Sequence, residues 1–230
     1  MFRGCSLMDI KMSNKNAYKL EFLGFAIFII FSGLAMIFYA GGTQMDPNAP
    51  GYSFWFNSLS DSGRSVAHNG KPNVISMILF SIAWIGFAIT TIPFYLVFPR
   101  VFEENPREKK LAEKGGYLGI IGSIAHVGIA FTPVDIFFAL HYLFVFIVYP
   151  AMVLAMIFYC NTIRQNEKFS KEYKYSFRFF TVLVIVSIIL GLVVSLATGI
   201  RELLTIFQKI GRISFLLGFS ILTIGAWKLE

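Results

Sequence analysis

Cysteine, histidine and charge are all scarce in this chain, and each shortage excludes a class of protein. The two cysteines, Cys5 and Cys160, form no CxxC metal motif and are too few for a disulfide framework. Charged residues make up 14% of the 230 residues, compared with about 25% in an average soluble domain. Apolar residues make up 56%, more than a soluble fold of this length could bury. We therefore expect a single domain that lies in lipid.

The positive charge is distributed in a way that argues against nucleic-acid binding. The formal net charge is +7, but the basic residues lie in short segments between apolar runs. This distribution is typical of a protein oriented in a membrane. We expect membrane lipids as partners and no nucleic acid, and the sequence leaves the oligomeric state open.

Six apolar runs approach the length of about 20 residues that a membrane-crossing helix needs. The third run is short and rich in glycine. The first run is long enough to span and has no small-residue cleavage site, so we expect a membrane helix and no cleaved signal peptide. The sequence thus predicts an all-α polytopic bundle of six transmembrane helices over residues 20–40, 74–97, 116–131, 136–159, 179–198 and 204–227.

Lysine and arginine are distributed unevenly between the two sides of this bundle. With the N-terminus inside, the cytoplasmic segments hold 15 of these residues and the outer segments hold 5. Basic residues are retained on the cytoplasmic side of a membrane. We therefore expect a multi-pass protein of the cell membrane with both termini in the cytoplasm, where its cysteines stay reduced.

The segment 41–72 is the one long connection between the expected spans. An aromatic group at residues 52–56 suits the headgroup zone of a membrane, and a polar stretch follows from Asn57 to Arg64. Long ordered connections are more often functional than filler. We expect residues 58–68 to form the lid of a site on the outer side.

Small residues and prolines mark how the helices pack. Small side chains on one face of the third span allow neighbouring backbones to approach closely; they are Gly115, Gly119, Gly122, Ser123 and Ala130. Pro93 and Pro150 lie inside the second and fourth spans, where each is expected to kink its helix.

Two of the three histidines lie inside apolar spans at matching depth. His126 and His141 are each six residues from the outer end of their span. At 1.5 Å per residue this is about 9 Å, so imidazoles on antiparallel neighbours could face one another. Lys209 and Arg212 fall in the outer part of the sixth span and share a helix face, as does Glu202. Buried charge usually faces a bundle interior, so we expect an outward-facing polar pocket between the third, fourth and sixth spans.

These residues also have structural interpretations. His126 and His141 could each hydrogen-bond a neighbouring helix, and Lys209 and Arg212 could extend to the outer headgroups.

The acidic candidates have structural interpretations as well. Thr132 could be an N-cap residue, with Pro133 at the first helical position and Asp135 at the third. Asp61 could likewise cap a short helix in the long connection.

A metal site is one chemistry that this pocket allows. Catalytic zinc commonly has three protein ligands and a water. His68, His126 and His141 could supply the nitrogens, and Asp61 or Asp135 an oxygen ligand or a catalytic general base. Such a site would hydrolyse a lipid ester or amide. There is no HExxH or other short ligand spacing, and the nearby basic residues would repel a divalent cation.

Anion binding is the chemistry we favour. The basic residues, assisted by Ser58, would clamp an anionic group such as a lipid phosphate. The expected ligand-binding residues are Ser60, Asp61, Arg64, His126, Asp135, His141, Lys209 and Arg212.

Two further chemistries rank behind these. His126 and His141 could hold a haem, but one pair of axial ligands supports one haem only. A Ser-His-Asp site could form where serines flank Asp61, but no GxSxG elbow supports it.

Three segments give the chain a family resemblance. Residues 58–63 resemble the "LSDLG" signature of the domain of unknown function family 998, which comprises bacterial and archaeal six-span membrane proteins. Residues 131–135 followed by His141 are similar to its "FP.D…H" pattern. Residues 199–212 are similar to its "G…ERi/QRi" entry into the last span. The eukaryotic DRAM/Sfk-like proteins share a looser version of this layout.

The resemblance implies the six-helix fold and points to Asp61, Asp135, His141 and Lys209 as site positions, without an established reaction. The chain departs from the pattern at Ser62, where the family usually has Leu, and at Lys209, where it usually has Arg. The second departure puts bidentate anion binding at that position in doubt.

The sequence therefore predicts a membrane protein that binds a lipid or an anionic amphiphile in an outward-facing polar pocket. The alternative is a zinc-dependent hydrolase embedded in the membrane.

Overall fold

The computed structural model describes residues 11–199 and 201–230, without the side chains of residues 201–203. The regular elements of the described chain are all helices, apart from an isolated β-bridge between Val66 and Pro72. The elements are α1 (Asn14–Ile37), η1 (Leu59–Gly63), α2 (Val74–Val97), η2 (Phe98–Phe102), α3 (Pro106–Phe131), α4 (Phe138–Gln165), α5 (Lys171–Thr198) and α6 (Arg201–Trp227). Cys5 lies outside the described residues.

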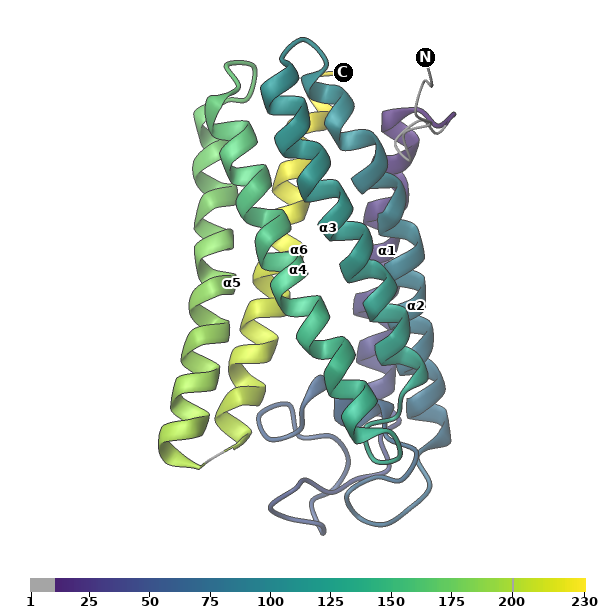
Figure 1. Ribbon diagram of the computed structural model, residues 1–230. Coiled ribbons are helices and arrows are strands. Elements are labelled where there is room, and N and C mark those ends of the chain that lie inside the picture. Colours follow the sequence, from purple (N-terminus) through teal and green to yellow (C-terminus); the bar gives the residue numbers. More distant parts are fainter. Residues whose placement is uncertain (1–10, 200) are drawn as a thin grey trace.

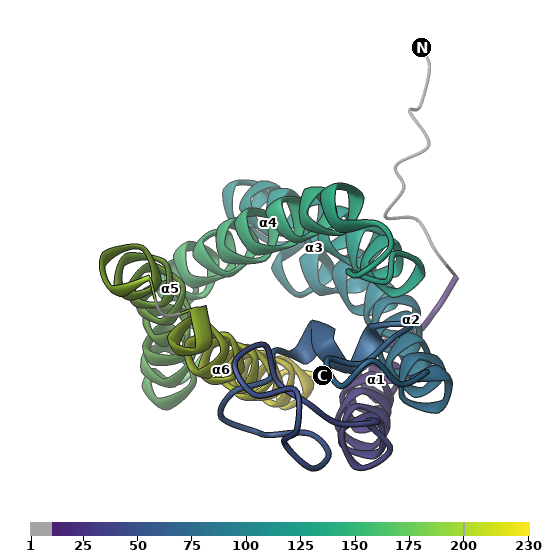
Figure 2. The same ribbon diagram turned by 90° about the horizontal axis from the view of Figure 1, so that it is seen from below.

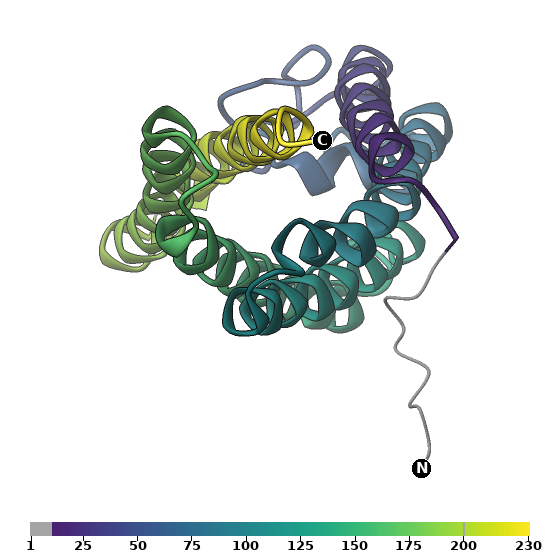
Figure 3. The same cartoon turned by 90° about the horizontal axis from the view of Figure 1, so that it is seen from above.

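The α-helices form three antiparallel hairpins, α1–α2, α3–α4 and α5–α6, which stand side by side (Figure 1). Seen along the bundle they follow one another around a ring, which α6 closes against α1 (Figures 2 and 3). The side chain of Asn14 donates to the carboxylate of Glu230, so the start of α1 and the C-terminus share one end. We call this the termini end. The opposite, loop end carries the long loop, residues 38–73.

Five of the six expected spans correspond to helices that are long and apolar enough to cross a membrane: α1, α2 with η2, α4, α5 and α6. α3 is of similar length and runs beside them, but its first two turns carry a cluster of charged residues, Arg107 to Lys114. Its apolar part is therefore short and rich in glycine.

The outer faces of the helices are apolar. On α5, large aliphatic side chains that recur every three or four residues are 41–84% exposed; they are Val182, Val186, Ile189, Val193 and Leu196. Such a face is stable only against lipid or another apolar surface.

Aromatic side chains fill the centre of the ring. Phe94 lies with its ring centroid 5.8 Å from Phe219 and 6.2 Å from Tyr159, and Phe215 lies 4.5 Å from Phe219. Edge-on and tilted contacts of this kind are favourable beyond the area they bury. The opening that the ribbons leave in Figures 2 and 3 is thus a packed interior.

The glycines of α3 make room for side chains of the neighbouring helices. An added Cβ at Gly115 would lie 2.6 Å from the ring of Tyr159, and one at Gly119 would lie 2.4 Å from the ring of Tyr95. Both distances are shorter than van der Waals contact, so these glycines create the space for aromatic rings from α4 and α2.

α3 begins ten residues before its expected start. Asn105 caps the helix by accepting hydrogen bonds from the N–H groups of Arg107 and Glu108 at 3.1 and 3.3 Å, and Pro106 stands at the first helical position. Glu108 is buried and accepts from the Asn166 amide at 2.7 Å. The helix continues into polar sequence because these local signals start it, not because the sequence is apolar.

Candidate functional site at the loop end

η1, within the long loop, carries several of the residues expected at the site. The hydroxyl of Ser58 accepts from the backbone N–H of Asp61 at 3.2 Å, and the Asp61 carboxylate accepts from the backbone N–H of Ser58 at 2.7 Å. This reciprocal capping box fixes both side chains. The expected role of Asp61 in capping a short helix is therefore confirmed.

Asp61 also holds His68 and Asn57. Nε2 of His68 lies 3.1 Å from Oδ1 of Asp61, and the Asn57 amide donates to Oδ2 at 3.3 Å. Burial alone would raise the pKa of Asp61. The hydrogen bond and charge of His68, with the hydrogen bonds from Ser58 and Asn57, outweigh burial and lower that pKa. Asp61 is thus an anion that organises the loop.

The long loop is anchored to α6 by the side chains of Lys209, Gln208 and Thr205, of which Thr205 donates to the backbone carbonyl of Trp55 at 2.8 Å. Nζ of Lys209 donates to the backbone carbonyl of Asn57 at 2.6 Å, and the side chain of Gln208 accepts from the N–H of Leu59 at 3.0 Å. The Lys209 ammonium also lies 5.1 Å from the ring centre of Phe54 and 5.8 Å from that of Tyr52. Backbone and aromatic faces together stabilise a cation that is 4% exposed.

A second anchor joins the long loop to the α3–α4 turn. The Asp135 carboxylate accepts from the N–H and the hydroxyl of Ser65, at 3.0 and 2.6 Å, and from the N–H of Val66 at 3.0 Å. Burial would raise the pKa of Asp135, but these hydrogen bonds outweigh it and the pKa is lowered. Asp135 therefore connects two segments that are 70 residues apart.

The expectation that Thr132 caps the start of the fourth helix is wrong. Thr132 ends α3, and its hydroxyl donates to the carbonyl of Gly128 at 2.8 Å. The N–H groups of Ile136 and Phe137 first close a turn on the carbonyl of Pro133, so α4 starts only at Phe138. This extra turn directs the Asp135 carboxylate towards the long loop instead of towards the helix.

His141 connects α4 to η1. Its Nδ1 lies 2.6 Å from the carbonyl oxygen of Thr132, and its Nε2 lies 3.0 Å from the hydroxyl of Ser60. The imidazole is 2% exposed, whereas Ser60 is half-buried. The structure therefore brings together two residues that were expected at the site, although they are 81 positions apart.

His126 instead pairs with Arg212, deeper in the bundle. Both terminal nitrogens of Arg212 lie 3.2 Å from Nε2 of His126. The guanidinium carbon lies 4.8 Å from the ring centre of Trp84 and 5.3 Å from that of Phe28. Arg212 is thus held by aromatic faces and a neutral acceptor, with no salt bridge in the part of the chain that the structure describes.

The three histidines have three separate sets of partners. His68 contacts Asp61, His126 contacts Arg212, and His141 contacts Ser60 and Thr132. Among residues 11–199 and 201–230, no group of three or more His, Cys, Asp or Glu side chains is placed to hold a metal ion. Both ring nitrogens of His141 are already engaged, so the expected pairing of imidazoles across the two helices is not formed either.

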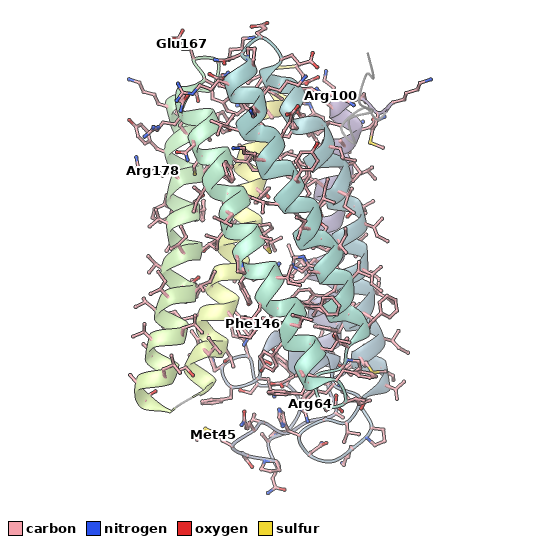
Figure 4. The ribbon with its side chains drawn as sticks, viewed as in Figure 1. Met45, Arg64, Arg100, Phe146, Glu167 and Arg178 are labelled. Atoms are coloured by element: carbon pink, nitrogen blue, oxygen red, sulfur yellow. The ribbon has the colours of Figure 1, made fainter. Side chains whose placement is uncertain are left out.

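The basic residues expected to clamp an anion also separate. Lys209 and Arg212 are only 4% and 7% exposed and turn towards groups of the protein. Arg64 is half-buried at the loop end, where its Nε donates to the carbonyl of Val66 at 3.0 Å (Figure 4). Of the three cations, only Arg64 is placed to meet a group from outside.

An apolar groove of about 560 Å³ lies between α2 and α3, next to the α3–α4 turn. Carbon-rich side chains line most of it: Met77, Ile78, Ser81, Ile82, Ile85, Gly86, Ala130, Phe131 and Pro133. On α2 it extends from Met77 to Gly86, about 13 Å at 1.5 Å per residue. At the loop end it is beside Pro133, two residues from the Asp135 that holds Ser65.

Several residues that build this region were missed by the sequence interpretation. Gln208 and the backbone carbonyl of Thr132 carry no recognisable signal, because amides and carbonyls occur everywhere. Glu21 does have one: it is a lone carboxylate in the first apolar run, and it is 1% exposed in α1, where Thr223 of α6 donates to it. A charge inside a membrane helix is a functional candidate by default. The side chain of Glu202 lies outside the described residues.

The chain was compared with known protein families, curated proteins and solved structures. Residues 20–224 match the family described as the Frag1/DRAM/Sfk1/Cwh43P N-terminal domain. This match supports the distant relation to DRAM and Sfk proteins. No curated protein and no solved structure matches the chain.

Proposed function

Since the chain belongs to the Frag1/DRAM/Sfk1/Cwh43P N-terminal domain family and is a membrane protein with five apolar helices, we propose that it binds a membrane lipid at its loop end. An acyl chain lies in the groove between α2 and α3, and an anionic headgroup lies beside Arg64. The bundle crosses the cell membrane six times with both termini in the cytoplasm, which places the loop end at the outer leaflet.

The groove is the observation that carries this proposal. Its volume of about 560 Å³ falls within the range of about 300–1,000 Å³ that is usual for small-molecule sites. It is lined almost entirely by apolar side chains and lies on helices that face lipid. Its long axis follows α2 from the loop end inwards, as an acyl chain does when its headgroup stays at the surface.

Arg64 supplies the headgroup partner. It directly precedes Ser65, whose N–H and hydroxyl are fixed by Asp135, and Asp135 is two residues from the groove-lining Pro133. The guanidinium has several N–H donors besides the Nε that binds Val66, and its planar fork matches a phosphate. The proposed lipid site thus has an apolar part, the groove, and a cationic part, Arg64, which are connected through Asp135 and Ser65.

The alternative of a zinc-dependent hydrolase is not favoured by the geometry. It required His68, His126 and His141 to act on one ion, but each has its own partner in a different part of the bundle. Lipid binding in the groove does not require the three histidines to lie close together.

Native mass spectrometry of the purified protein in detergent tests the proposal. With phosphatidylglycerol or phosphatidylcholine added, we expect one retained lipid and a preference for the anionic species. Ile82→Trp should fill the groove and abolish retention of both lipids. Arg64→Glu should remove the preference while leaving binding of phosphatidylcholine.

Two matched variants control for general effects. Ile89→Trp adds the same ring to an exposed position of α2 two turns further along the helix, outside the groove. Lys71→Glu reverses a charge at an exposed position of the same loop. Both should bind lipid like the wild type. Equal retention by wild type and Ile82→Trp would refute the proposal.

A further inference from the structure

We infer that Ser60 and His141 form a nucleophile and general-base pair that transfers the acyl group of a bound lipid ester. This inference rests on the proposed lipid binding, and adds to it a reaction and a substrate class. Its basis is the contact between the Ser60 hydroxyl and Nε2 of His141 at 3.0 Å.

The surroundings of His141 dictate which nitrogen carries the proton. Nδ1 lies 2.6 Å from the carbonyl oxygen of Thr132, which can only accept a hydrogen bond. Nδ1 must therefore be protonated, and in the neutral imidazole Nε2 carries the lone pair. The Ser60 hydroxyl then donates to Nε2, which is the arrangement in which histidine can take the proton of a serine nucleophile.

The third group of a catalytic triad has a counterpart here. In the Ser-His-Asp arrangement a carboxylate fixes the tautomer and orientation of the histidine. Here the carbonyl of Thr132 has that role, held by the end of α3 and by the turn that follows. It lacks the negative charge of a carboxylate, so we expect a slower base than in a complete triad.

The contact is not needed to hold the long loop in place. Asn57 is bound by Lys209, Leu59 by Gln208, and Ser65 by Asp135. η1 is also fixed internally by its capping box. With this many anchors around it, the contact between Ser60 and His141 brings a serine to a base without any evident gain in loop attachment.

His141 is also linked to the proposed acyl site through Thr132. Thr132 stands between Phe131 and Pro133, which both line the apolar groove. The residue that orients His141 is thus flanked by the residues that would contact an acyl chain. Ser60 is half-buried, so it is partly shielded from solvent but still accessible to a ligand.

The reaction proceeds in two steps. Oγ of Ser60 attacks the ester carbonyl carbon while Nε2 of His141 takes the hydroxyl proton; the bond to the glycerol oxygen breaks, and that oxygen receives the proton. Water then attacks the acyl-serine, His141 accepts a proton from the water and returns it to Oγ, and a fatty acid is released. A second lipid hydroxyl in place of water would complete an acyl transfer.

The test is covalent labelling of the full chain in nanodiscs of phosphatidylglycerol and phosphatidylcholine. A fluorophosphonate probe should add one equivalent, located on Ser60 by peptide mass spectrometry. Ser60→Ala should abolish labelling, and His141→Gln should slow it about 100-fold or more, the usual contribution of a general base. Ser53→Ala, in the same loop but outside the pair, should label at the wild-type rate.

Lipid retention measured on the same samples separates this inference from the proposal it rests on. Retained lipid without labelling of Ser60 overturns the nucleophile–base pair and leaves lipid binding intact. Labelling of Ser60 without retained lipid overturns lipid binding. Wild-type unfolding and lipid retention in Ser60→Ala, together with loss of fatty-acid release from phosphatidylglycerol, supports both.

Discussion

Arg212 of α6 and His126 of α3 meet across the bundle, with both terminal guanidinium nitrogens 3.2 Å from the same imidazole nitrogen. Arginine can only donate hydrogen bonds, so Nε2 of His126 must be the acceptor and the imidazole is neutral. A cation is therefore held in the interior by a lone pair and by the faces of Phe28 and Trp84. The planar shape of the Arg212 guanidinium is therefore needed at this position, in addition to its charge.

We predict that Arg212→Lys destabilises the protein by about 2 kcal/mol or more, because lysine cannot stack between the rings or donate twice to His126. The SDS concentration at half-unfolding measures this loss. Arg164→Lys, at an exposed position of α4, is the matched control and should leave the midpoint unchanged. Equal midpoints for the two variants would show that charge alone suffices.

The lowered pKa of Asp61 predicts a pH-dependent stability. A carboxyl whose pKa is depressed on folding stabilises the protein above its unfolded pKa, about 3.9, and this stability is lost as pH falls through the lower folded pKa. We expect Asp61→Asn to be less stable than wild type at pH 7, with the difference shrinking below about pH 4. Thermal unfolding across pH measures it. Asp46→Asn, at an exposed position of the same loop, should not differ from wild type; a constant gap for Asp61→Asn at all pH values would contradict the linkage.

Gly119→Ala should destabilise the bundle by about 1–3 kcal/mol, the usual cost of overpacking. The new Cβ would lie 2.4 Å from the ring of Tyr95, which has Phe94 and Phe219 around it and little room to move. Gly33→Ala in α1 provides the comparison, because nothing lies within 4 Å of its added Cβ. Thermal unfolding of both variants measures the difference. If Gly119→Ala were as stable as Gly33→Ala, the close contact between Gly119 and the ring of Tyr95 would be contradicted.

Asp135→Ala should make the long loop easier to cut. Removing the carboxylate deprives Ser65 and Val66 of their hydrogen bonds, so the backbone after Arg64 is freed for trypsin. We expect faster cleavage at Arg64, followed by gel electrophoresis and mass spectrometry. Cleavage at Arg107, at the termini end, serves as the internal reference and should keep its rate.

Much of the helical framework was predictable from the sequence, because lipid imposes a simple rule on each segment separately. The bounds of α2 were predicted without error, and the glycine face of α3 was recognised from its spacing. The start of α3 was missed because apolarity was the criterion, whereas Asn105 and Pro106 start the helix in polar sequence.

The site was predictable as a set of residues but not as a set of pairs. Ser60, His141, His126 and Arg212 were all expected, yet the sequence paired the two histidines with one another. Depth along a helix follows from counting residues, but the direction in which a side chain points depends on how each helix is rotated about its axis. That rotation depends on packing between helices that are far apart in the sequence.

Because the chain is synthesised from its N-terminus, the long loop is made well before the α6 residues that anchor it. Leu59 and Asn57 find their partners 149 and 152 residues later, in the last helix. While α6 is still being synthesised, these backbone groups stay open to water or to a chaperone. Docking of the loop therefore has to wait until α6 has been made, and a product truncated before α6 would leave these groups exposed to quality control.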